Sequence, residues 1–266
     1  MSRGEKSHYF QEEEDHRLRI DRSRALPLPR AFYDVPCRVL AQNLLGKLVV
    51  RQTSANERLS GRIVETEAYL GEKDKAAHSY GGRKTKKNSS MFSRPGTAYV
   101  YVIYGIHHCL NVTSAGSGSA VLVRALEPVE GIEEMRQRRE TGRRRGSGRK
   151  RLLRDWELCN GPGKLCAALG IDKSTADGCD LAGEDEKCSA IENDADDDDH
   201  HRHCAGGGDD GIVKCARIGV DYAGEEWASK PLRFYLKASE AVSVRNREAE
   251  GKPKRRRLSD EKRETT

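Results

Sequence analysis

The chain has 266 residues, 36% hydrophobic and 34% charged, which is enough for one good-sized domain, or two small ones, with a real core. Its formal net charge of +6 is unevenly distributed, because residues 184–210 carry eleven acids and two bases, a net charge of −9, and the rest of the chain therefore carries +15. No apolar run approaches the roughly 18 residues of a membrane helix and residues 1–24 lack the apolar stretch of a secretion signal, so a membrane-spanning or secreted protein is not expected.

The first predicted elements follow a charged, aperiodic stretch over residues 1–28, which is expected to be a disordered tail. Apolar spacing predicts a helix over residues 36–45, with Gly46 as its stop signal. Strands are expected over residues 47–51 and 61–67, joined by a polar turn.

The middle of the chain predicts a β-hairpin. Residues 98–103 are β-branched and aromatic, as is typical of a strand, and Tyr104 and Gly105 would turn the chain back into a second strand over residues 109–113. A further strand is expected over residues 119–126.

Two helical segments and a basic run follow. Pro128 is expected to open a helix that carries Ile132 and Met135 towards the core. Residues 136–154 contain ten Lys or Arg and one acid. Such a run is commonly a solvated face, but it also suits a polyanionic partner, because Lys and Arg release counterions from a phosphate backbone. The second helical segment is expected over residues 155–169, broken at its Gly-Pro-Gly sequence.

The last strands are expected over residues 212–220 and 231–237. Before them lies an acidic, low-complexity insert at about residues 183–211, to which no structure is assigned. The sum is an α+β fold: a single mixed domain over residues 29–243 with mostly antiparallel strands and flanking helices, followed by a basic disordered tail over residues 244–266.

One apparent dinucleotide-binding motif is rejected, and no metal site is expected. Residues 206–211 match G-x-G-x-x-G, but they precede a strand rather than a helix, and their two aspartates would repel a pyrophosphate. The histidines and cysteines of the insert lack a C-x-x-C pair. Eight cysteines are too few for a disulfide scaffold, so reduced thiols in an intracellular compartment are expected. Cys109, Cys159 and Cys166 are interpreted as small core residues.

One predicted strand carries two acids. Alternation places Ile63, Glu65 and Glu67 on one face. The pair could be a solvated feature of an edge strand, or one carboxylate could act as a general base in a partly dry pocket. Alternation cannot say which glutamate would take that role.

Tyrosines on the predicted hairpin suggest a binding surface. Tyr99, Tyr101 and Ile103 share one face, so Tyr101 could line a pocket. Tyr104 would sit at the hairpin tip and point away from that pocket, which suits a wedge between nucleic-acid bases. Ordinary strand tyrosines are the alternative interpretation.

Several longer segments occur together in a fixed order. They are RIVETEAYLG (62–71), AAHS (76–79), RPGTAYVYVIYG (94–105), Asn111, LVRALEP (122–128), GPGKL (161–165) and KPLRFY (230–235). In these segments the chain resembles the alkyladenine (3-methyladenine) DNA glycosylases, and the similarity covers about 180 residues, over 32–181 and 214–243. Motifs of this length in this order make the resemblance highly specific.

The resemblance implies a monomeric hydrolase that needs no metal or cofactor and starts base-excision repair. Such an enzyme binds double-stranded DNA through the minor groove, flips out a damaged purine (alkylated, deaminated or etheno) and hydrolyses its N-glycosidic bond without lyase activity. The implied fold has a curved antiparallel sheet, as in the C-terminal domain of formyltransferases. The basic run at residues 252–257 indicates a nuclear localisation signal, and a solvated basic tail is the alternative interpretation.

By position, the resemblance makes Glu67 the general base that activates water, and Arg124 the residue that helps to hold this water beside the DNA backbone. Tyr69, His78 and Tyr101 would sandwich the flipped base. The other implied roles are exclusion of the guanine amine by Asn111, lining of the base pocket by Ala76 and Leu122, filling of the minor-groove gap by Tyr104, and DNA-backbone contacts from Arg83, Lys87, Tyr99, Gly161, Gly163 and Lys164.

The sequence departs from the family pattern in places. His107 and His108 follow the proposed wedge where the family has bulky apolar or aromatic residues, and Lys86 and Lys87 stand where a proline and an arginine are expected. The acidic insert has no implied role, although it could compete with DNA for the basic face. Two rival hypotheses remain, a lesion-binding DNA protein that has lost catalysis and a general RNA-binding protein.

Overall fold

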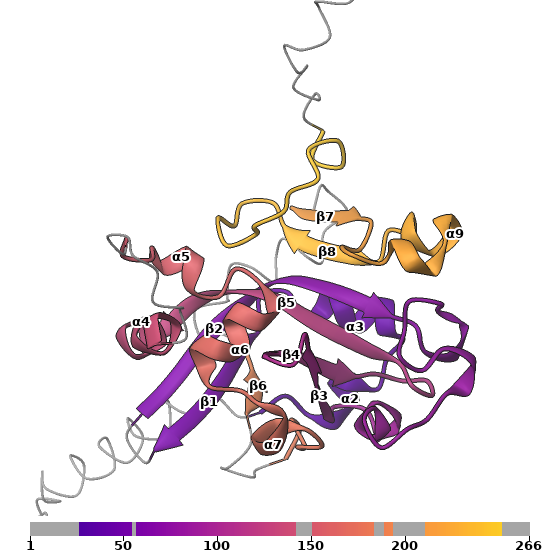
Figure 1. Cartoon of the computed structure of the whole chain (residues 1–266), viewed down its shortest axis with the longest axis horizontal. Helices are drawn as coiled ribbons and strands as arrows, with labels where there is room; N and C mark the ends of the chain where they lie inside the picture. The colour runs from indigo at the N-terminus through magenta and orange to yellow at the C-terminus, as the bar shows by residue number, and fades with distance from the viewer. Residues whose placement is uncertain (1–26, 55–56, 142–150, 184–188, 194–210, 252–266) are drawn as a thin grey trace, which may run out of the picture.

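The computed structural model describes residues 27–54, 57–141, 151–183, 189–193 and 211–251 of the chain (Figure 1). The strands are β1 (Leu48–Ser54), β2 (Glu57–Tyr69), β3 (Ala98–Ile103), β4 (His107–Thr113), β5 (Ala120–Glu130), β6 (Ala190–Glu192), β7 (Ile212–Cys215) and β8 (Arg233–Leu236). The helices are α2 (Arg30–Tyr33), α3 (Cys37–Asn43), α4 (Ile132–Thr141), α5 (Asp155–Leu158), α6 (Pro162–Leu169), α7 (Lys173–Ala176) and α9 (Glu225–Ala228), with 3-10 turns η1 (Gly71–Lys73), η2 (Tyr80–Gly82), η3 (Ser89–Phe92) and η4 (Asp221–Ala223). Within these ranges, no helix has the length and apolar character that a membrane crossing requires.

The strands form one antiparallel sheet in the order β3-β4-β5-β2-β1-β6. The 13-residue strand β2 lies at its centre and also pairs with β8, which in turn pairs with β7. The sheet is strongly curved, and β7 and β8 lie across one side of it (Figure 1). The predicted α+β fold with a curved, mostly antiparallel sheet is confirmed.

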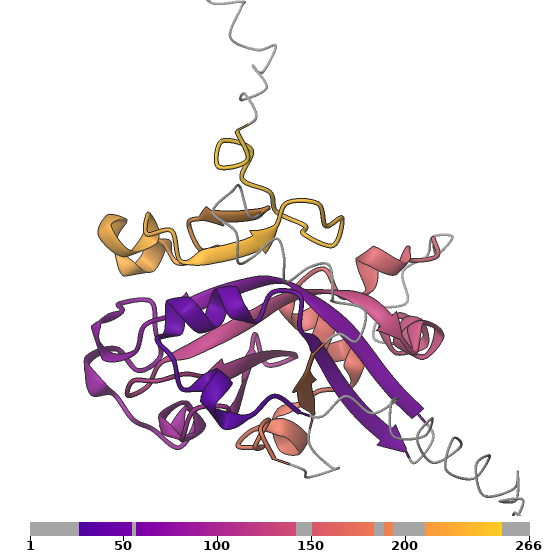
Figure 2. The same ribbon diagram turned by 180° about the vertical axis from the view of Figure 1, so that it is seen from behind.

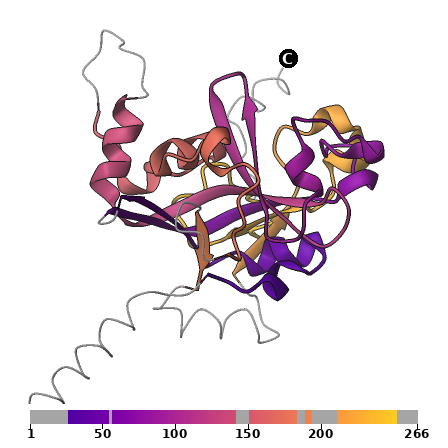
Figure 3. The ribbon, with the colours of Figure 1, turned by 90° about the horizontal axis from the view of Figure 1, so that it is seen from below.

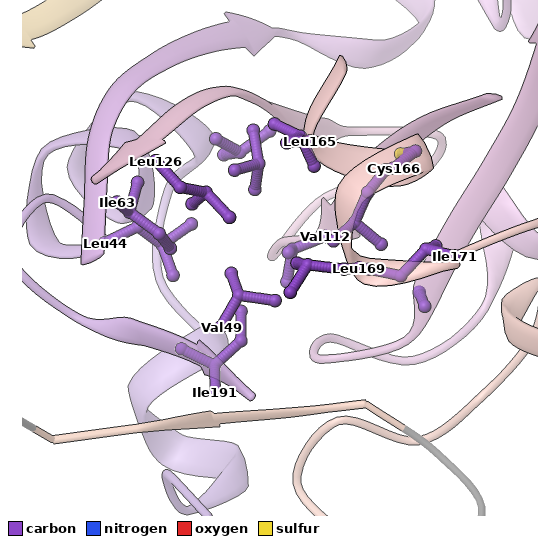
Figure 4. Close-up of a cluster of buried hydrophobic side chains, with 14 of the residues drawn as sticks. Leu44, Val49, Ile63, Val112, Leu126, Leu165, Cys166, Leu169, Ile171 and Ile191 are labelled. Atoms are coloured by element: carbon purple, nitrogen blue, oxygen red, sulfur yellow. The ribbon is translucent and has the colours of Figure 1, made fainter. Parts of the chain in front are cut away.

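The main core fills one face of this sheet. Alternate residues of β3, β4 and β5, among them Val100, Val112 and Val123, belong to the core cluster together with Leu44 of α3 and Leu165 of α6. Helix α3 packs against β2 and β5, on the side of the molecule nearest the viewer in Figure 2. The apolar side chains of strands and helices interdigitate in Figure 4. The residues between them on each strand therefore face the opposite side of the sheet.

The predicted hairpin between β3 and β4 is confirmed. Tyr104 has a φ of +54°, and Gly105 follows with a φ of +72°. Two successive residues in the left-handed region form the tight turn that suits two twisted strands. The hairpin projects from the sheet between α6 on one side and α9 on the other (Figure 3).

The helix predicted from Pro128 begins later, so that prediction is wrong. Pro128 lies inside β5, where it faces Gly61 of β2 next to a register shift. A proline is tolerated at such a bulge, because the ladder is already interrupted there. The helix α4 starts at Ile132, after Gly131 with a φ of +72°, and it still buries Met135.

A second irregularity overturns part of the predicted alternation in β2. The pairing of β2 with β5 shifts on both sides of Glu65, so that Ile63 faces Leu126 while Glu65 faces Ala125. As a result Ile63 packs in the main core, whereas the side chains of Glu65 and Glu67 form ion pairs with Arg124. The bulge thus separates the apolar residue from the two acids that simple alternation would place beside it.

Several predicted segments fall only partly on described residues. The described chain already includes Leu28, which is buried, and residues 244–251, where Arg245 forms an ion pair with Glu250. Strand β6 lies inside the range assigned to the acidic insert and pairs with β1. Residues 55–56 of the predicted turn, residues 184–188 and 194–210 of the insert, and residues 252–257 lie outside the described residues.

The cysteines follow the expectation in all but one described case. Cys37, Cys109, Cys159, Cys166 and Cys215 are free and buried. Cys179 is disulfide-bonded. The expectation of reduced thiols is therefore wrong at this position.

Candidate active site

A row of facing residues crosses the sheet on the side opposite the main core. Tyr99 of β3 faces Asn111 of β4, which faces Leu122 of β5. Leu122 faces Glu67 of β2, which faces Arg233 of β8. Neighbours two positions away on each strand point the same way. The topology therefore gathers predicted site residues that are up to 57 positions apart, from Glu67 to Arg124.

Glu67 is fully buried and accepts hydrogen bonds with both carboxylate oxygens. The Tyr69 hydroxyl donates to Oε2 at 2.9 Å, and the backbone N–H of Ile218 donates to Oε1 at 2.8 Å. A guanidinium nitrogen of Arg124 lies 3.3 Å from Oε1. These three partners fix the carboxylate in one orientation, as a general base requires.

Glu65 lies close to Glu67 and forms ion pairs with two arginines. Its Oε1 accepts from Arg124 Nε at 3.1 Å and from Arg233 Nη1 at 2.8 Å. Burial alone would lower the pKa of Arg124, but the charges of Glu67 and Glu65 outweigh it and raise that pKa. Arg124 therefore stays cationic between the two acids, and Glu67 is the acid that also contacts the aromatic residues.

Tyr69 is held by its ring as well as by its hydroxyl. Burial, and then the nearby charge of Glu67, raise the pKa of Tyr69 well above its ordinary value, so the phenol remains a donor. The guanidinium of Arg217 lies 4.7 Å from the ring centroid, within the range of a cation–π contact. Arg217 in turn forms a fully buried ion pair with Asp74, at 2.5 and 2.9 Å.

Asp74 organises the loop that follows β2. Its carboxylate also accepts from the backbone N–H groups of Leu70 and Ala76, each at 3.0 Å. Ala76 is buried and packs near Tyr69. This loop carries His78 towards β3, so the Asp74–Arg217 pair connects Tyr69 to His78 through the backbone.

Four aromatic rings meet next to the acids. His78 Nδ1 lies 2.9 Å from the Tyr99 hydroxyl, and the His78 ring packs edge-on to Tyr101 at 4.7 Å between centroids. Tyr69 packs against the same cluster from β2. Burial lowers the pKa of His78, so the ring is neutral near pH 7.

The side chain of Asn111 is held in one orientation next to these rings. Its amide Nδ2 donates to the backbone oxygens of Tyr99 at 3.0 Å and Cys109 at 3.2 Å. Both amide protons are thereby used, and the side chain cannot rotate without losing them. Leu122 is buried next to it.

The hairpin tip stands apart from the pocket. Tyr104 is 86% exposed and Ile106 is 72% exposed. Gly163 of α6 packs so closely against the hairpin that a Cβ there would lie 3.1 Å from the Cβ of His107. His108 accepts from the backbone N–H of Lys173.

The residues expected to contact a DNA backbone are mostly on the surface. Arg83 and Lys87 are exposed on loops, and Asn88 holds that segment by donating to the backbone oxygens of His78 and Arg83. Gly161, Gly163 and Lys164 lie at the start of α6. Tyr99 differs, because it is only 2% exposed and its hydroxyl is bonded to His78. Its geometry supports the pocket instead of a backbone contact.

A family model described as methylpurine-DNA glycosylase (MPG) matches residues 31–240. The chain belongs to this family. It is 48% identical over 248 residues to the DNA-3-methyladenine glycosylase of Mus musculus, which covers 92% of this chain and 67% of the relative. It is 50% identical over 219 residues to the human DNA-3-methyladenine glycosylase, covering 82% of this chain and 68% of the relative. A putative 3-methyladenine DNA glycosylase of Desulfitobacterium hafniense is 43% identical over 220 residues, 82% of this chain and 98% of that protein.

Sequence reasoning missed part of this site. It gave no role to Asp74, Arg217 or the backbone of Ile218, because they meet Tyr69 and Glu67 only after folding. Arg233 offered a signal: an arginine inside a short strand with Phe234 and Tyr235 is expected to have a buried acidic partner. That partner is Glu65.

Proposed function

We propose that Glu67 activates the water that releases a damaged purine from DNA, and that the chain has no lyase activity. Family membership makes the chain a DNA repair hydrolase that excises alkylated purines. The observation that carries the proposal for Glu67 is its buried, fixed carboxylate on the same sheet face as three aromatic rings.

The reaction needs a carboxylate at this place. As the N-glycosidic bond breaks, the sugar gains oxocarbenium character, and a nearby carboxylate with an oriented water stabilises and captures it. Glu67 would accept a proton from the water, and Arg124 would hold that water beside the DNA backbone. The ion pairs of Arg124 with both acids, at 3.1 and 3.3 Å, preorganise this arrangement.

The aromatic cluster would receive the base. A purine inside a duplex is unreachable and must be flipped out, at a cost of a few kcal/mol. Stacking on Tyr69, His78 and Tyr101 would offset this cost by about 1–3 kcal/mol per contact. Alkylated purines are cationic, so electron-rich rings attract them and a neutral His78 avoids repelling them. Asn111, fixed by two backbone carbonyls, would exclude the amine of guanine.

The exposed hairpin tip would stabilise the flipped state. Tyr104 has no burial to lose, since it is 86% exposed, and a wedge of this kind fills the gap left in the minor groove. Exposed cations such as Arg83, Lys87 and Lys164 would position the phosphates. We extend the proposal to deaminated and etheno purines, to action as a monomer and to a nuclear location.

A base-release assay tests this proposal. A duplex with one hypoxanthine or ethenoadenine is incubated with the protein, and alkali then cleaves the strand at each abasic site. Glu67→Gln should lower single-turnover base release by about 10²- to 10⁴-fold and leave lesion binding within about tenfold. Glu133→Gln, on an acid whose side chain is 87% exposed, is the matched control. Full activity of Glu67→Gln would refute the role of Glu67, and lesion binding without base release by the parent protein would favour a non-catalytic binding protein.

A further inference from the structure

A groove of about 410 Å³ lies next to the acidic site, between β8 and the segment that follows it. Its walls come from residues 216–218, from Arg233, and from residues 244–248. Two of these walls contact the candidate catalytic acids directly: Ile218 N–H donates to Glu67, and Arg233 donates to Glu65. The groove therefore shares its inner wall with the active site.

Three arginines that line the groove are ion-paired. Arg217 pairs with Asp74, Arg233 with Glu65, and Arg245 with Glu250. Backbone oxygens accept further bonds from each of them: Ala68 from Arg217, Ala216 and Val244 from Arg233, and Lys237 and Ser239 from Arg245. Because a guanidinium carries five N–H donors, each of the three still keeps at least one that is not used by a described residue. Arg217 Nε is buried and has no hydrogen-bond partner among the described residues. A buried, charged donor without an acceptor costs free energy unless a ligand or water satisfies it.

The rim of the groove adds two further donor groups. Arg247 is exposed and forms no hydrogen bond or ion pair with any described residue. Asn246 is held by its backbone N–H, which donates to the Tyr235 hydroxyl at 2.9 Å, and by its Oδ1, which accepts from Ala249 N–H. Its Nδ2 has no hydrogen-bond partner within the part of the chain that the structure describes. Glu248 supplies the one carboxylate among the lining residues.

We propose that this groove is a phosphate subsite. A phosphate oxygen accepts charge-assisted hydrogen bonds from guanidinium and amide donors, and Arg247 can bind two oxygens at once. Given the proposed function, the phosphate belongs to the DNA strand next to the flipped nucleotide, and a free phosphate is the other source of the same chemistry. Because Ile218 and Arg233 line the groove and each donates a hydrogen bond to one of the two acids, an occupant would restrain Glu67 and Glu65 through these contacts.

The first arm of the test uses inorganic phosphate alone, measured by ³¹P NMR line broadening on the full chain without DNA. Arg247→Ala should weaken binding at least tenfold, and Arg247→Lys should weaken it less, because Lys keeps the charge but not the bidentate geometry. Arg38→Ala, an exposed arginine on α3, is the matched control and should match the parent. Circular dichroism confirms that each variant is folded.

The second arm uses a lesion duplex and its salt dependence. If the occupant is a DNA phosphate, Arg247→Ala should reduce the slope of log K against log salt by about 0.9. A single methylphosphonate at the contacted phosphate should then abolish the effect of Arg247→Ala. A changed affinity for inorganic phosphate with an unchanged slope identifies a free phosphate as the occupant.

The proposal is overturned if Arg247→Ala matches the parent in both arms. Its failure is separate from a failure of the proposed function. The phosphate titration requires no catalysis, whereas base release by the parent protein tests the glycosylase activity directly.

Discussion

Replacing Asp74 by Asn should destabilise the whole site, because this side chain is the acceptor for four donors. It binds Arg217 at 2.5 and 2.9 Å and the N–H groups of Leu70 and Ala76 at 3.0 Å, and both charged side chains are fully buried. In Asp74→Asn one oxygen becomes an amide nitrogen, so that at least one arginine donor and one backbone donor face another donor. Breaking a buried ion pair from one side costs about 3–5 kcal/mol, a large part of the roughly 5–15 kcal/mol that stabilises a domain.

Urea denaturation followed by tryptophan fluorescence measures this loss, and Asp221→Asn, an exposed acid on η4, is the matched control. The double variant Asp74→Asn with Arg217→Met should recover part of the loss, since the uncompensated cation is then removed. A loss below about 1 kcal/mol for Asp74→Asn would show that the pair behaves like an exposed one and would refute the reasoning.

Three further predictions concern the aromatic residues. Tyr69→Phe keeps the ring but removes the 2.9 Å hydrogen bond to Glu67. Single-turnover base release should fall about 10- to 100-fold, because a hydrogen bond to a charged group contributes about 1.5–3 kcal/mol. An unchanged rate would mean that this bond does not position Glu67. Tyr104→Ser should lower the population of extruded base, and an equal fluorescence signal from a flipped-base analogue would argue against the wedge. Burial lowers the pKa of His78, so the folded state binds this proton less readily than the unfolded state, and the stability contribution of neutral His78 should be present above about pH 6.5 and be lost as the pH falls. A stability difference between the parent and His78→Asn that stays constant from pH 8 to 5 would contradict this.

The hairpin and its tyrosines could be predicted because they depend on local rules. A period of two separates Val100, in the main core, from Tyr99 and Tyr101 on the other face. The exposed Tyr104 follows from the tight turn that Gly105 permits. Residue type and spacing are sufficient to predict the hairpin, because each of its features depends only on neighbouring positions.

The remaining features depend on contacts that spacing does not encode. The bulge beside Glu65 sends Ile63 to the core, and Pro128 stays in β5 because the ladder is already irregular there. The acid 143 positions before Arg217 becomes its partner only when the chain closes around Tyr69. Likewise β6 forms inside an acidic segment because it completes the edge of β1, not because its composition favours a strand.

The central claim is that a damaged purine leaves the duplex and lies between aromatic rings while Glu67 faces its sugar carbon. A crystal structure of the Glu67→Gln variant bound to a duplex with one ethenoadenine tests it most directly. The base should lie against Tyr69, His78 and Tyr101, with Tyr104 in the vacated gap and the side chain at position 67 facing C1′ across one water. A lesion still stacked in the helix, or a sugar carbon held far from position 67, would contradict the account.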